Sequence, residues 1–296
     1  MNTFIKTALG TALLSASVGA QALTVYAVTT TNQLGSFDSA TPAATANVGA
    51  ISGLQSGEVV LGIDFRPATG QLFALGSTSR LYVINTSTAA ATLVGSGFST
   101  PTLFGLSFGF DFNPTVDRIR SVSDGDQNLR LNPITGGNAA TDTTLAYAGS
   151  DVNAGDNPAI VGSAYTNNFA AAPSTVLYGI DWQNDILVTQ SPPNAGTLNT
   201  VGALGINTSD QVGFDIFSSG GIDTAFASLT TGDGGGFYGI NLLTGSASLI
   251  GYVDPNWVGV GNSLRDIAIA PVPLPGAIWL LGGALGFLGA ARRRSA

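Results

Sequence analysis

A short strand pattern that recurs about every 50 residues constrains the fold of this chain more than any other sequence feature. The recurring segments are VYAV at 25–28, LFAL at 72–75, IRSV at 119–122, LYGI at 177–180 and AFAS at 225–228. Their last residues are separated by 47, 47, 58 and 48 positions. A repeat of this length is typical of β-propellers, in which each repeat forms one blade.

Each repeat contains the residues for a four-stranded sheet. The second strand ends at Asp38, Asn85, Asn132, Gln190 and Asn241. Asn, Thr and Gly residues follow several of these ends and predict a tight turn into a third strand, because such residues bond their own backbone or tolerate a positive φ. A further strand precedes four of the units, as GIDF at 62–65, GFDF at 109–112, GSAY at 162–165 and GFDI at 213–216. The sequence therefore predicts an all-β, five-bladed β-propeller, with an open β-solenoid as the alternative.

The first unit lacks this preceding strand, and a matching segment, LRDI at 264–267, follows the last unit. We expect the C-terminal strand to join the first blade. Such an exchange would close the ring and leave no free sheet edge to aggregate. An open solenoid would not need it.

Four aspartates occupy the same place in the preceding strand, and Ala164 takes that place in the remaining unit. They are Asp64, Asp111, Asp215 and Asp266. If this strand is innermost, the carboxylates could face the central channel and bind Ca²⁺ or a polyhydroxyl ligand. The alternative is that each aspartate caps a turn or bonds backbone within its own blade.

A second candidate for Ca²⁺ is the segment with Asp124, Asp126 and Asn128, which resembles the start of an EF-hand loop. Leu129 stands where the sharp turn of that loop needs Gly, and Thr135 stands where it needs a bidentate Glu. A solvated turn explains the same residues. No cofactor other than Ca²⁺ is expected.

The chain of 296 residues contains no His and no Cys. This excludes a Ser-His-Asp triad, a Cys nucleophile, thiolate or imidazole metal sites, and disulfides. Residues 23–270 contain all 18 acidic residues but only six arginines, which gives this segment a formal charge of −12. Nucleic acid is therefore not an expected partner. We predict no catalytic residue.

Enzymatic activity on a polysaccharide remains an alternative. Arg66, Arg118, Arg120 and Arg130 could hold an acidic sugar, with a tyrosine as the base of a lyase-type elimination. A glycosidase would need at least one Asp in its carboxylate pair, because Glu58 is the only glutamate. Exposed or paired arginines explain the same residues without catalysis.

Both ends of the chain carry patterns of export. Residues 1–22 have the form of a secretory signal peptide, with Lys6, an apolar stretch and an Ala20-x-Ala22 cleavage pattern. At the other end stand Val272, Pro273, Leu274 and Pro275, then 16 apolar or small residues at 276–291, then Arg292, Arg293 and Arg294. As a helix the apolar part is about 24 Å long, short for a hydrocarbon core of about 30 Å. The arginines would stay on the cytoplasmic side.

The order of these three parts resembles the PEP-CTERM class of sorting signals, in its variant with a Val-Pro-Leu-Pro motif. The resemblance implies export in a Gram-negative bacterium, transient retention in the inner membrane, processing by an exosortase, and delivery to the cell surface or extracellular matrix. A plain C-terminal membrane anchor is the alternative.

Residues 23–270 also resemble an uncharacterised family, domain of unknown function (DUF) 4394. The resemblance is carried by LGIDFRP at 61–67, GFDFNP at 109–114 and RIRSVS at 118–123. It supports one domain over these residues and implies no activity.

Together these observations predict a signal peptide at 1–22, a β-propeller at 23–270 and a sorting signal with a short transmembrane helix at 271–296. We expect an exported, non-enzymatic binding or structural module of the cell surface or extracellular matrix. Extracellular polysaccharide or another surface protein would be its partner. The alternative function is a polysaccharide-active enzyme, either a glycosidase or a lyase.

Overall fold

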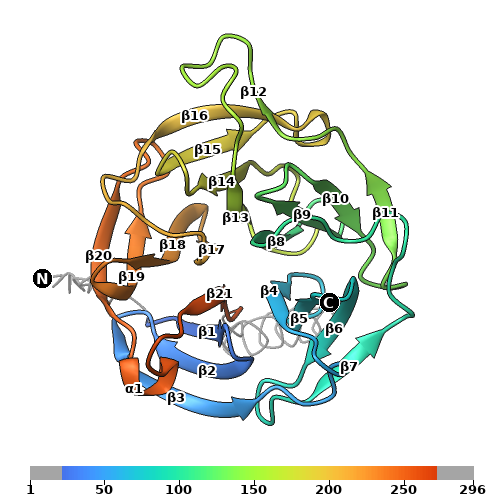
Figure 1. Ribbon diagram of the computed structural model, residues 1–296, viewed down its shortest axis with the longest axis vertical. Coiled ribbons are helices and arrows are strands. Elements are labelled where there is room, and N and C mark those ends of the chain that lie inside the picture. The colour runs from blue at the N-terminus through green and yellow to red at the C-terminus, as the bar shows by residue number, and fades with distance from the viewer. Residues whose placement is uncertain (1–21, 272–296) are drawn as a thin grey trace, which may run out of the picture.

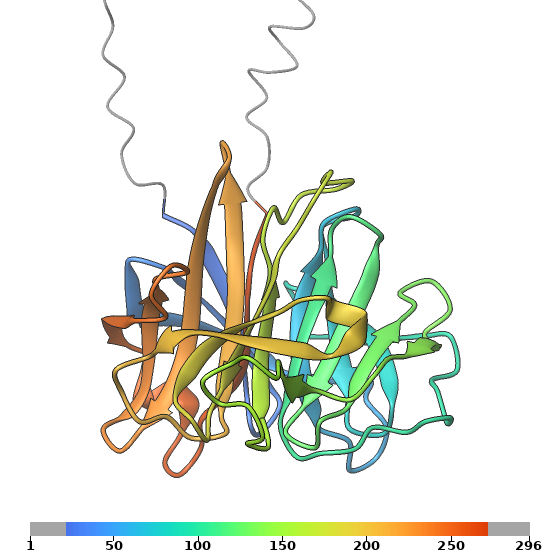
Figure 2. The same ribbon diagram turned by 90° about the horizontal axis from the view of Figure 1, so that it is seen from above.

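Strands separated by short turns fold into five sheets that surround a central axis (Figure 1). The computed structural model describes residues 22–271. Seen from the edge of the ring, the strands run through its depth (Figure 2). The all-β, five-bladed β-propeller predicted from the repeat is confirmed.

The blades are numbered here in chain order, and their strands are given from the axis outward. Blade 1 consists of β21 (Leu264–Ile269), β1 (Thr24–Thr29), β2 (Gln33–Asp38) and β3 (Thr41–Ala50). Blade 2 consists of β4 (Val60–Arg66), β5 (Gln71–Gly76), β6 (Arg80–Ile84) and β7 (Ala91–Val94). Blade 3 consists of β8 (Phe108–Asn113), β9 (Arg118–Ser123), β10 (Asn128–Leu131) and β11 (Asn138–Thr141).

The last two blades differ from one another in strand number. Blade 4 consists of β13 (Ile160–Tyr165), β14 (Leu177–Asp181), β15 (Ile186–Gln190), β16 (Thr197–Ala203) and a parallel outer strand, β12 (Ala146–Tyr147). Blade 5 consists of β17 (Val212–Ser219), β18 (Ile222–Thr231), β19 (Gly234–Ile240) and β20 (Ala247–Tyr252). Two single-turn helices, η1 (Pro193–Ala195) and α1 (Pro255–Val258), lie in the connections.

The first blade contains strands from both ends of the described chain. β21 pairs antiparallel with β1, with Val25 opposite Ile269 and Val28 opposite Asp266. In the ring, β21 takes the innermost place that β4, β8, β13 and β17 take in the other blades (Figure 1).

A repeated asparagine builds the turn after the third strand from the axis in blades 2, 3 and 5, which is the strand counted as the second of each repeat in the sequence. The Oδ1 atom of Asn85 accepts a hydrogen bond from the Ser87 N–H at 2.9 Å. Asn132 and Asn241 each make the same contact, also at 2.9 Å, with the residue two positions later. The tight turns predicted at these positions are therefore confirmed, and side-chain capping of the backbone is their cause. Blade 4 departs from this pattern, because Gln190 stands at the equivalent position.

The hydrophobic core lies mainly between neighbouring blades. Strands β4 and β13 are buried along their whole length, whereas the outer strand β7 is partly exposed. Phe73 of blade 2 and Phe112 of blade 3 pack edge to face, with ring centroids 5.1 Å apart. Phe37 of blade 1 and Phe237 of blade 5 do the same at 5.1 Å. Such contacts between blades bury apolar side chains that a single sheet would leave exposed.

A glycine two residues before the repeated aspartate position brings the inner strands together. A Cβ atom on Gly109 would lie 2.7 Å from the Ser163 nitrogen of blade 4. On Gly213 it would lie 2.6 Å from the Ile267 nitrogen of blade 1. Only a residue without a side chain permits these distances, so the glycine sets how closely neighbouring inner strands can approach.

Within residues 22–271 no helix has the length and apolar character to cross a membrane. The predicted signal peptide lies outside the described residues, apart from Ala22, and so does the predicted C-terminal transmembrane helix.

Gly109→Ala should destabilise the propeller by about 1–3 kcal/mol, because the new methyl group meets fixed backbone of the next blade. Thermal unfolding should show a lower Tm, by about 2–4 °C for each kcal/mol. Gly149→Ala is the control, since a Cβ atom on Gly149 has nothing within 4 Å. Equal Tm values for the two variants would show that close approach of the inner strands is not a constraint.

Candidate functional site

The four repeated aspartates lie on the innermost strands, around the axis of the ring. Asp266 belongs to β21, Asp64 to β4, Asp111 to β8 and Asp215 to β17. None of the four is more than 4% exposed. They are therefore withdrawn from solvent, unlike most aspartates.

Each of these aspartates accepts a hydrogen bond from the backbone of the next blade. The backbone N–H of Ile63 donates to Asp266 at 2.8 Å, and that of Phe112 donates to Asp64 at 2.7 Å. The N–H of Tyr165 donates to Asp111 at 3.0 Å, and that of Ile269 donates to Asp215 at 2.6 Å. The alternative weighed from the sequence, in which each aspartate caps a turn or bonds backbone within its own blade, therefore describes only part of these contacts. In Asp215 and Asp266 the second carboxylate oxygen does bond the following N–H of its own strand.

Strand geometry explains why the aspartate reaches the next blade. Residues i and i+2 of a strand point to the same face, so Gly62 and Asp64 both face blade 3. The missing side chain of the glycine brings the strands close, and the aspartate spans the remaining gap. In blade 4 the aspartate is replaced by Ala164, so this contact toward β17 is missing.

Burial raises the pKa of all four aspartates. For Asp64 the charge of Asp215 adds to the effect of burial, and for Asp111 the charges of Asp64 and Asp215 add to it. The pKa of Asp215 is raised to about 6, and burial raises that of Asp266 well above its usual range. Within residues 22–271, one group of acidic side chains is close enough to share a metal ion, and it consists of Asp64, Asp111 and Asp215.

The segment that resembles an EF-hand does not form such a group. The Oδ1 atom of Asn128 accepts hydrogen bonds from Arg120 at 2.6 Å and from Gln190 at 3.2 Å. Asp124 accepts from the Leu106 N–H at 2.8 Å and thereby holds a loop. Among the described residues, Asp126 forms no hydrogen bond with Asn128. The Asn128 oxygen already accepts a hydrogen bond from Arg120, so it is not free to bind Ca²⁺.

A second site lies between blades 3 and 4, where a cavity of about 250 Å³ opens. We call it the arginine pocket. It is lined by Asn113, Val116, Arg118, Ile119, Arg120, Arg130, Tyr165, Pro192, Pro193 and Asn194. Arg118 and Arg120 are two residues apart on β9, and Arg130 of β10 pairs with Arg120 across the sheet. The strand period and the cross-strand register therefore bring three cations to one place.

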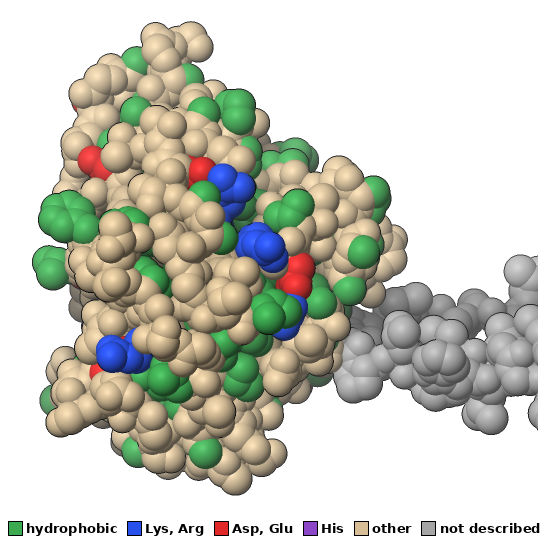
Figure 3. Space-filling model, turned by 90° about the vertical axis from the view of Figure 1, so that its right-hand side faces the viewer, with side chains coloured by type: hydrophobic (Ala, Val, Ile, Leu, Met, Phe, Trp, Pro, Cys, Tyr) green, Lys and Arg blue, Asp and Glu red, His purple; other side chains and the backbone are tan. Residues whose placement is uncertain are grey.

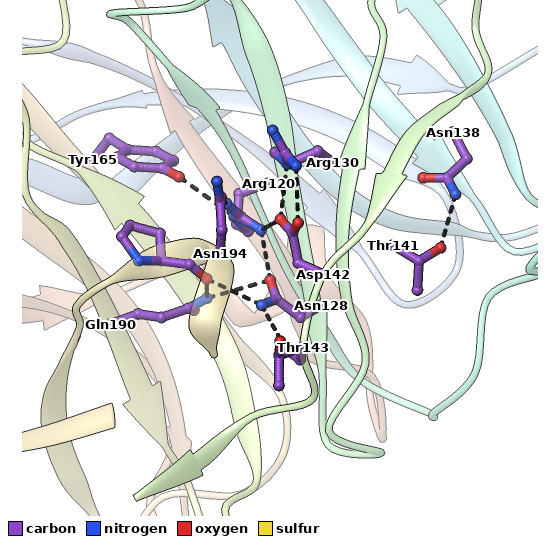
Figure 4. A network of polar contacts seen from close by, with 11 residues as sticks. Arg120, Asn128, Arg130, Asn138, Thr141, Asp142, Thr143, Tyr165, Gln190 and Asn194 are labelled. Carbon is purple, nitrogen blue, oxygen red and sulfur yellow. Dashed lines mark hydrogen bonds and ion pairs between the residues drawn. The ribbon is translucent and has the colours of Figure 1, made fainter. Parts of the chain in front are cut away.

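Asp142 holds two of these arginines in fixed positions (Figure 4). Its Oδ2 atom lies 2.7 Å from Nη1 of Arg120 and 2.8 Å from Nε of Arg130. Arg120 also donates to Asn128 at 2.6 Å and to Asn194 at 2.8 Å. The side chains of Arg120 and Asp142 are only 2% and 7% exposed. Asp142 is therefore a structural counter-ion, and it neutralises only one of the pocket's three positive charges.

Arg118 and the outer part of Arg130 remain available to a ligand. Among residues 22–271 the Arg118 side chain makes one hydrogen bond, to the carbonyl of the preceding residue, Asp117, at 2.8 Å. Its charge also acts on the Asp117 carboxyl, whose pKa is lowered first by Arg66 and in addition by Arg118. The Arg130 side chain is 36% exposed. On the side of the ring that carries β7 and β11, most of the basic side chains in view lie near one another with acidic side chains beside them, and another basic side chain lies apart (Figure 3).

Tyr165 borders the same pocket, with its ring pointing toward Arg120 (Figure 4). Its hydroxyl lies 3.4 Å from Nε of Arg120. Burial raises the pKa of Tyr165 in spite of the neighbouring arginine. A tyrosine that acts as a base needs a lowered pKa, so this environment opposes the lyase chemistry considered from the sequence.

The sequence indicated three of the pocket arginines but not their partners. Arg66, the fourth arginine of that set, forms an ion pair with Asp117 and does not line the pocket. Asp142, Asn194 and Gln190 complete the network and were not among the candidates. The sequence contains a signal for Gln190, because this residue stands where the repeats of blades 2, 3 and 5 have the turn asparagine. Its amide bonds Asn128 and the Pro193 carbonyl, the latter at 2.7 Å.

The chain belongs to the family described as "Domain of unknown function (DUF4394)", whose model matches residues 33–268. The resemblance noted in the sequence is thereby confirmed. No curated protein matches the sequence.

Two solved structures are similar to this chain at low sequence identity. Glutaminyl cyclase from Myxococcus xanthus is 13% identical, with a TM-score of 0.43 over 71% of this chain and 90% of that chain. A chain of the nidogen/laminin complex is 9% identical, with a TM-score of 0.46 over 86% of this chain and 100% of that chain. At this distance neither structure indicates an activity.

The axial aspartates predict an unusual pH dependence for the metal-free protein. Their raised pKa values mean that the folded state favours the neutral carboxyl groups. This contribution to stability is complete below the unfolded pKa of about 3.9 and is lost as the pH rises through the folded values. For Asp215 that value is about 6. The Tm in metal-free buffer should therefore fall between pH 5 and pH 7, and Asp215→Asn should reduce the slope. A Tm that rises across this interval would contradict the assignment.

Asp142→Asn should lower the free energy of unfolding by about 3 kcal/mol, because it leaves the charge of buried Arg120 without a counter-ion. Urea denaturation would measure the loss. Asp117→Asn is the matched control, since the Asp117 side chain is 36% exposed in its ion pair with Arg66. It should cost about 1 kcal/mol or less. Similar losses in the two variants would mean that Asp142 does not hold the network.

Proposed function

We propose that this protein is a non-enzymatic module of the bacterial cell surface or extracellular matrix that binds an acidic polysaccharide in the arginine pocket. One observation carries the proposal. A domain with a formal charge of −12 places three of its six arginines around a single cavity, and within residues 22–271 the one carboxylate that forms ion pairs with them is Asp142.

The pocket chemistry fits a sugar carboxylate. A guanidinium group binds a carboxylate with two parallel hydrogen bonds, and Arg118 has its outer nitrogens free of other side chains. Asn113 and Asn194 add neutral polar groups that suit sugar hydroxyls. At about 250 Å³ the cavity lies below the range of about 300–1,000 Å³ typical of drug-sized ligands. It would therefore hold one sugar unit and leave the rest of the polymer outside.

The same geometry favours binding over cleavage. A glycosidase needs two carboxyl groups on opposite sides of the sugar, and no Asp or Glu lines the pocket. Asp142 lies behind the arginines and is engaged by both of them. A lyase remains the alternative function, with Tyr165 as its base, although the raised pKa of this tyrosine opposes it.

The localisation part of the proposal is supported by the sequence patterns at both ends of the chain. Residues 1–22 would direct export, and the tail at 271–296 would hold the precursor in the inner membrane through its transmembrane helix until an exosortase processes it. The pairing of β21 with β1 supports the related prediction that the C-terminal strand closes the ring. A polysaccharide of the matrix, or a second surface protein, would then be within reach of the domain.

Binding of the purified full-length protein to polygalacturonate, with neutral dextran as the comparison polymer, tests the function. Arg118→Gln should weaken binding to polygalacturonate about tenfold, because one charge-assisted hydrogen-bond pair is lost. Arg80→Gln removes the same charge outside the pocket and should leave binding unchanged. Equal binding of both polymers, or equal effects of both variants, would refute the proposal. Shortening of the polymer would establish the lyase or glycosidase alternative.

A further inference from the structure

We propose that Asp64, Asp111 and Asp215 bind a Ca²⁺ ion on the axis of the propeller and that this ion joins three blades. The site is separate from the arginine pocket. It rests on the position of these side chains in the ring and not on the proposed polysaccharide binding.

The carboxylate oxygens are already placed for a shared cation. One oxygen from each of the three residues lies within 4.8 Å of the others. Two ligands of the same Ca²⁺ ion can be separated by up to about twice the metal–oxygen distance of 2.3–2.6 Å. The limit is about 4.2 Å for Mg²⁺, which also demands a stricter geometry. The upper bound of 4.8 Å on these oxygen separations is therefore compatible with a shared Ca²⁺ ion.

An oxygen without a partner points to a ligand at this place. Asp64 is 1% exposed, and its Oδ2 atom accepts the Phe112 N–H at 2.7 Å. Its Oδ1 atom is buried and has no hydrogen-bond partner among residues 22–271. A buried carboxylate oxygen without a partner is costly, and most buried polar atoms in proteins are satisfied. A cation shared with Asp111 and Asp215 would satisfy it.

The protein itself supplies no positive charge to the group. The ion pairs within residues 22–271 join Arg66 with Asp117, and Arg120 and Arg130 with Asp142. None of them includes an axial aspartate. Arg265 lies on β21 next to Asp266, whose charge acts on it, but within residues 22–271 the two side chains form no ion pair. Burial and mutual repulsion both raise the pKa of Asp64 and Asp111. Without a cation the carboxyl groups avoid this repulsion by binding protons, whereas a divalent cation would neutralise their charge directly.

The ion would complete the contacts that the aspartates already make between blades. Asp64, Asp111 and Asp215 belong to blades 2, 3 and 5, and each also bonds the backbone of the next blade. A shared ion would therefore connect β17 of blade 5 to β4 and β8, which one of these bonds already joins to each other. Asp266 of blade 1 lies on the same ring but is not part of the group of three.

Equilibrium dialysis of the full-length protein against CaCl₂, followed by elemental analysis, should find one Ca²⁺ ion per chain. Thermal unfolding should show a Tm that rises by about 5–10 °C when the Ca²⁺ concentration is a hundred times the Kd. Asp64→Asn should weaken Ca²⁺ binding by about 100-fold or more, because it removes a ligand charge. Asparagine retains an acceptor for the Phe112 N–H, so this variant should still fold. Asp111→Asn is a second variant and should have the same effect.

Asp124→Asn is the control, because Asp124 belongs to the other candidate segment and lies outside the axial group. Ca²⁺ binding that is lost in this variant and kept in Asp64→Asn and Asp111→Asn would overturn the proposal. Absence of Ca²⁺ uptake by the unmodified protein would overturn it as well and would leave protons as the means of neutralising the aspartates. None of the axial variants should alter binding to polygalacturonate. A failure of the proposed function and a failure of this inference are therefore distinguishable.

Discussion

The hydrogen bonds from one inner strand to an aspartate of the preceding blade are the contacts on which the ring depends. Four such bonds, of 2.6 to 3.0 Å, connect blades at the axis. A sheet edge at the centre of a ring has backbone N–H groups that no further strand can pair. The aspartates satisfy some of these groups, and the preceding glycines let the strands approach closely enough. Hydrogen bonds to a charged or strongly polar acceptor typically contribute about 1.5–3 kcal/mol each.

This arrangement also creates a problem that the protein must resolve. The carboxyl groups that hold the blades together are forced toward one another in a space with little water. Burial raises their pKa values, and the mutual repulsion raises them further, as it does in other pairs of buried carboxyl groups. The ring must then carry either protons or a cation at its centre. Structural support and cation binding would thus have the same origin in the repeated glycine and aspartate.

The candidate binding site lies where the repeat is broken. Blade 4 has Ala164 in place of the aspartate, Gln190 in place of the turn asparagine, and the extra strand β12. Between blades 3 and 4 lie both the polar network around Arg120 and Asp142 and an apolar cluster that includes Val122 and Val188. The pocket is positive within an acidic domain, and salt screens charges beyond about 8 Å under physiological conditions. Short-range contacts with the arginines would therefore decide which polymer binds.

The sequence by itself determined the number of blades, the strands of each repeat, the turns built by asparagine and the membership of a family. These features depend on local patterns, namely period, alternation and turn residues, which recur within about 50 positions. The partners of the aspartates and of the arginines depended on the tertiary structure. Asp64 meets Phe112 and Arg120 meets Asn194 only because neighbouring blades are packed at a fixed distance and rotation. That placement results from the whole ring. Residues far apart in the chain therefore become partners although no local sequence pattern predicts the pairing.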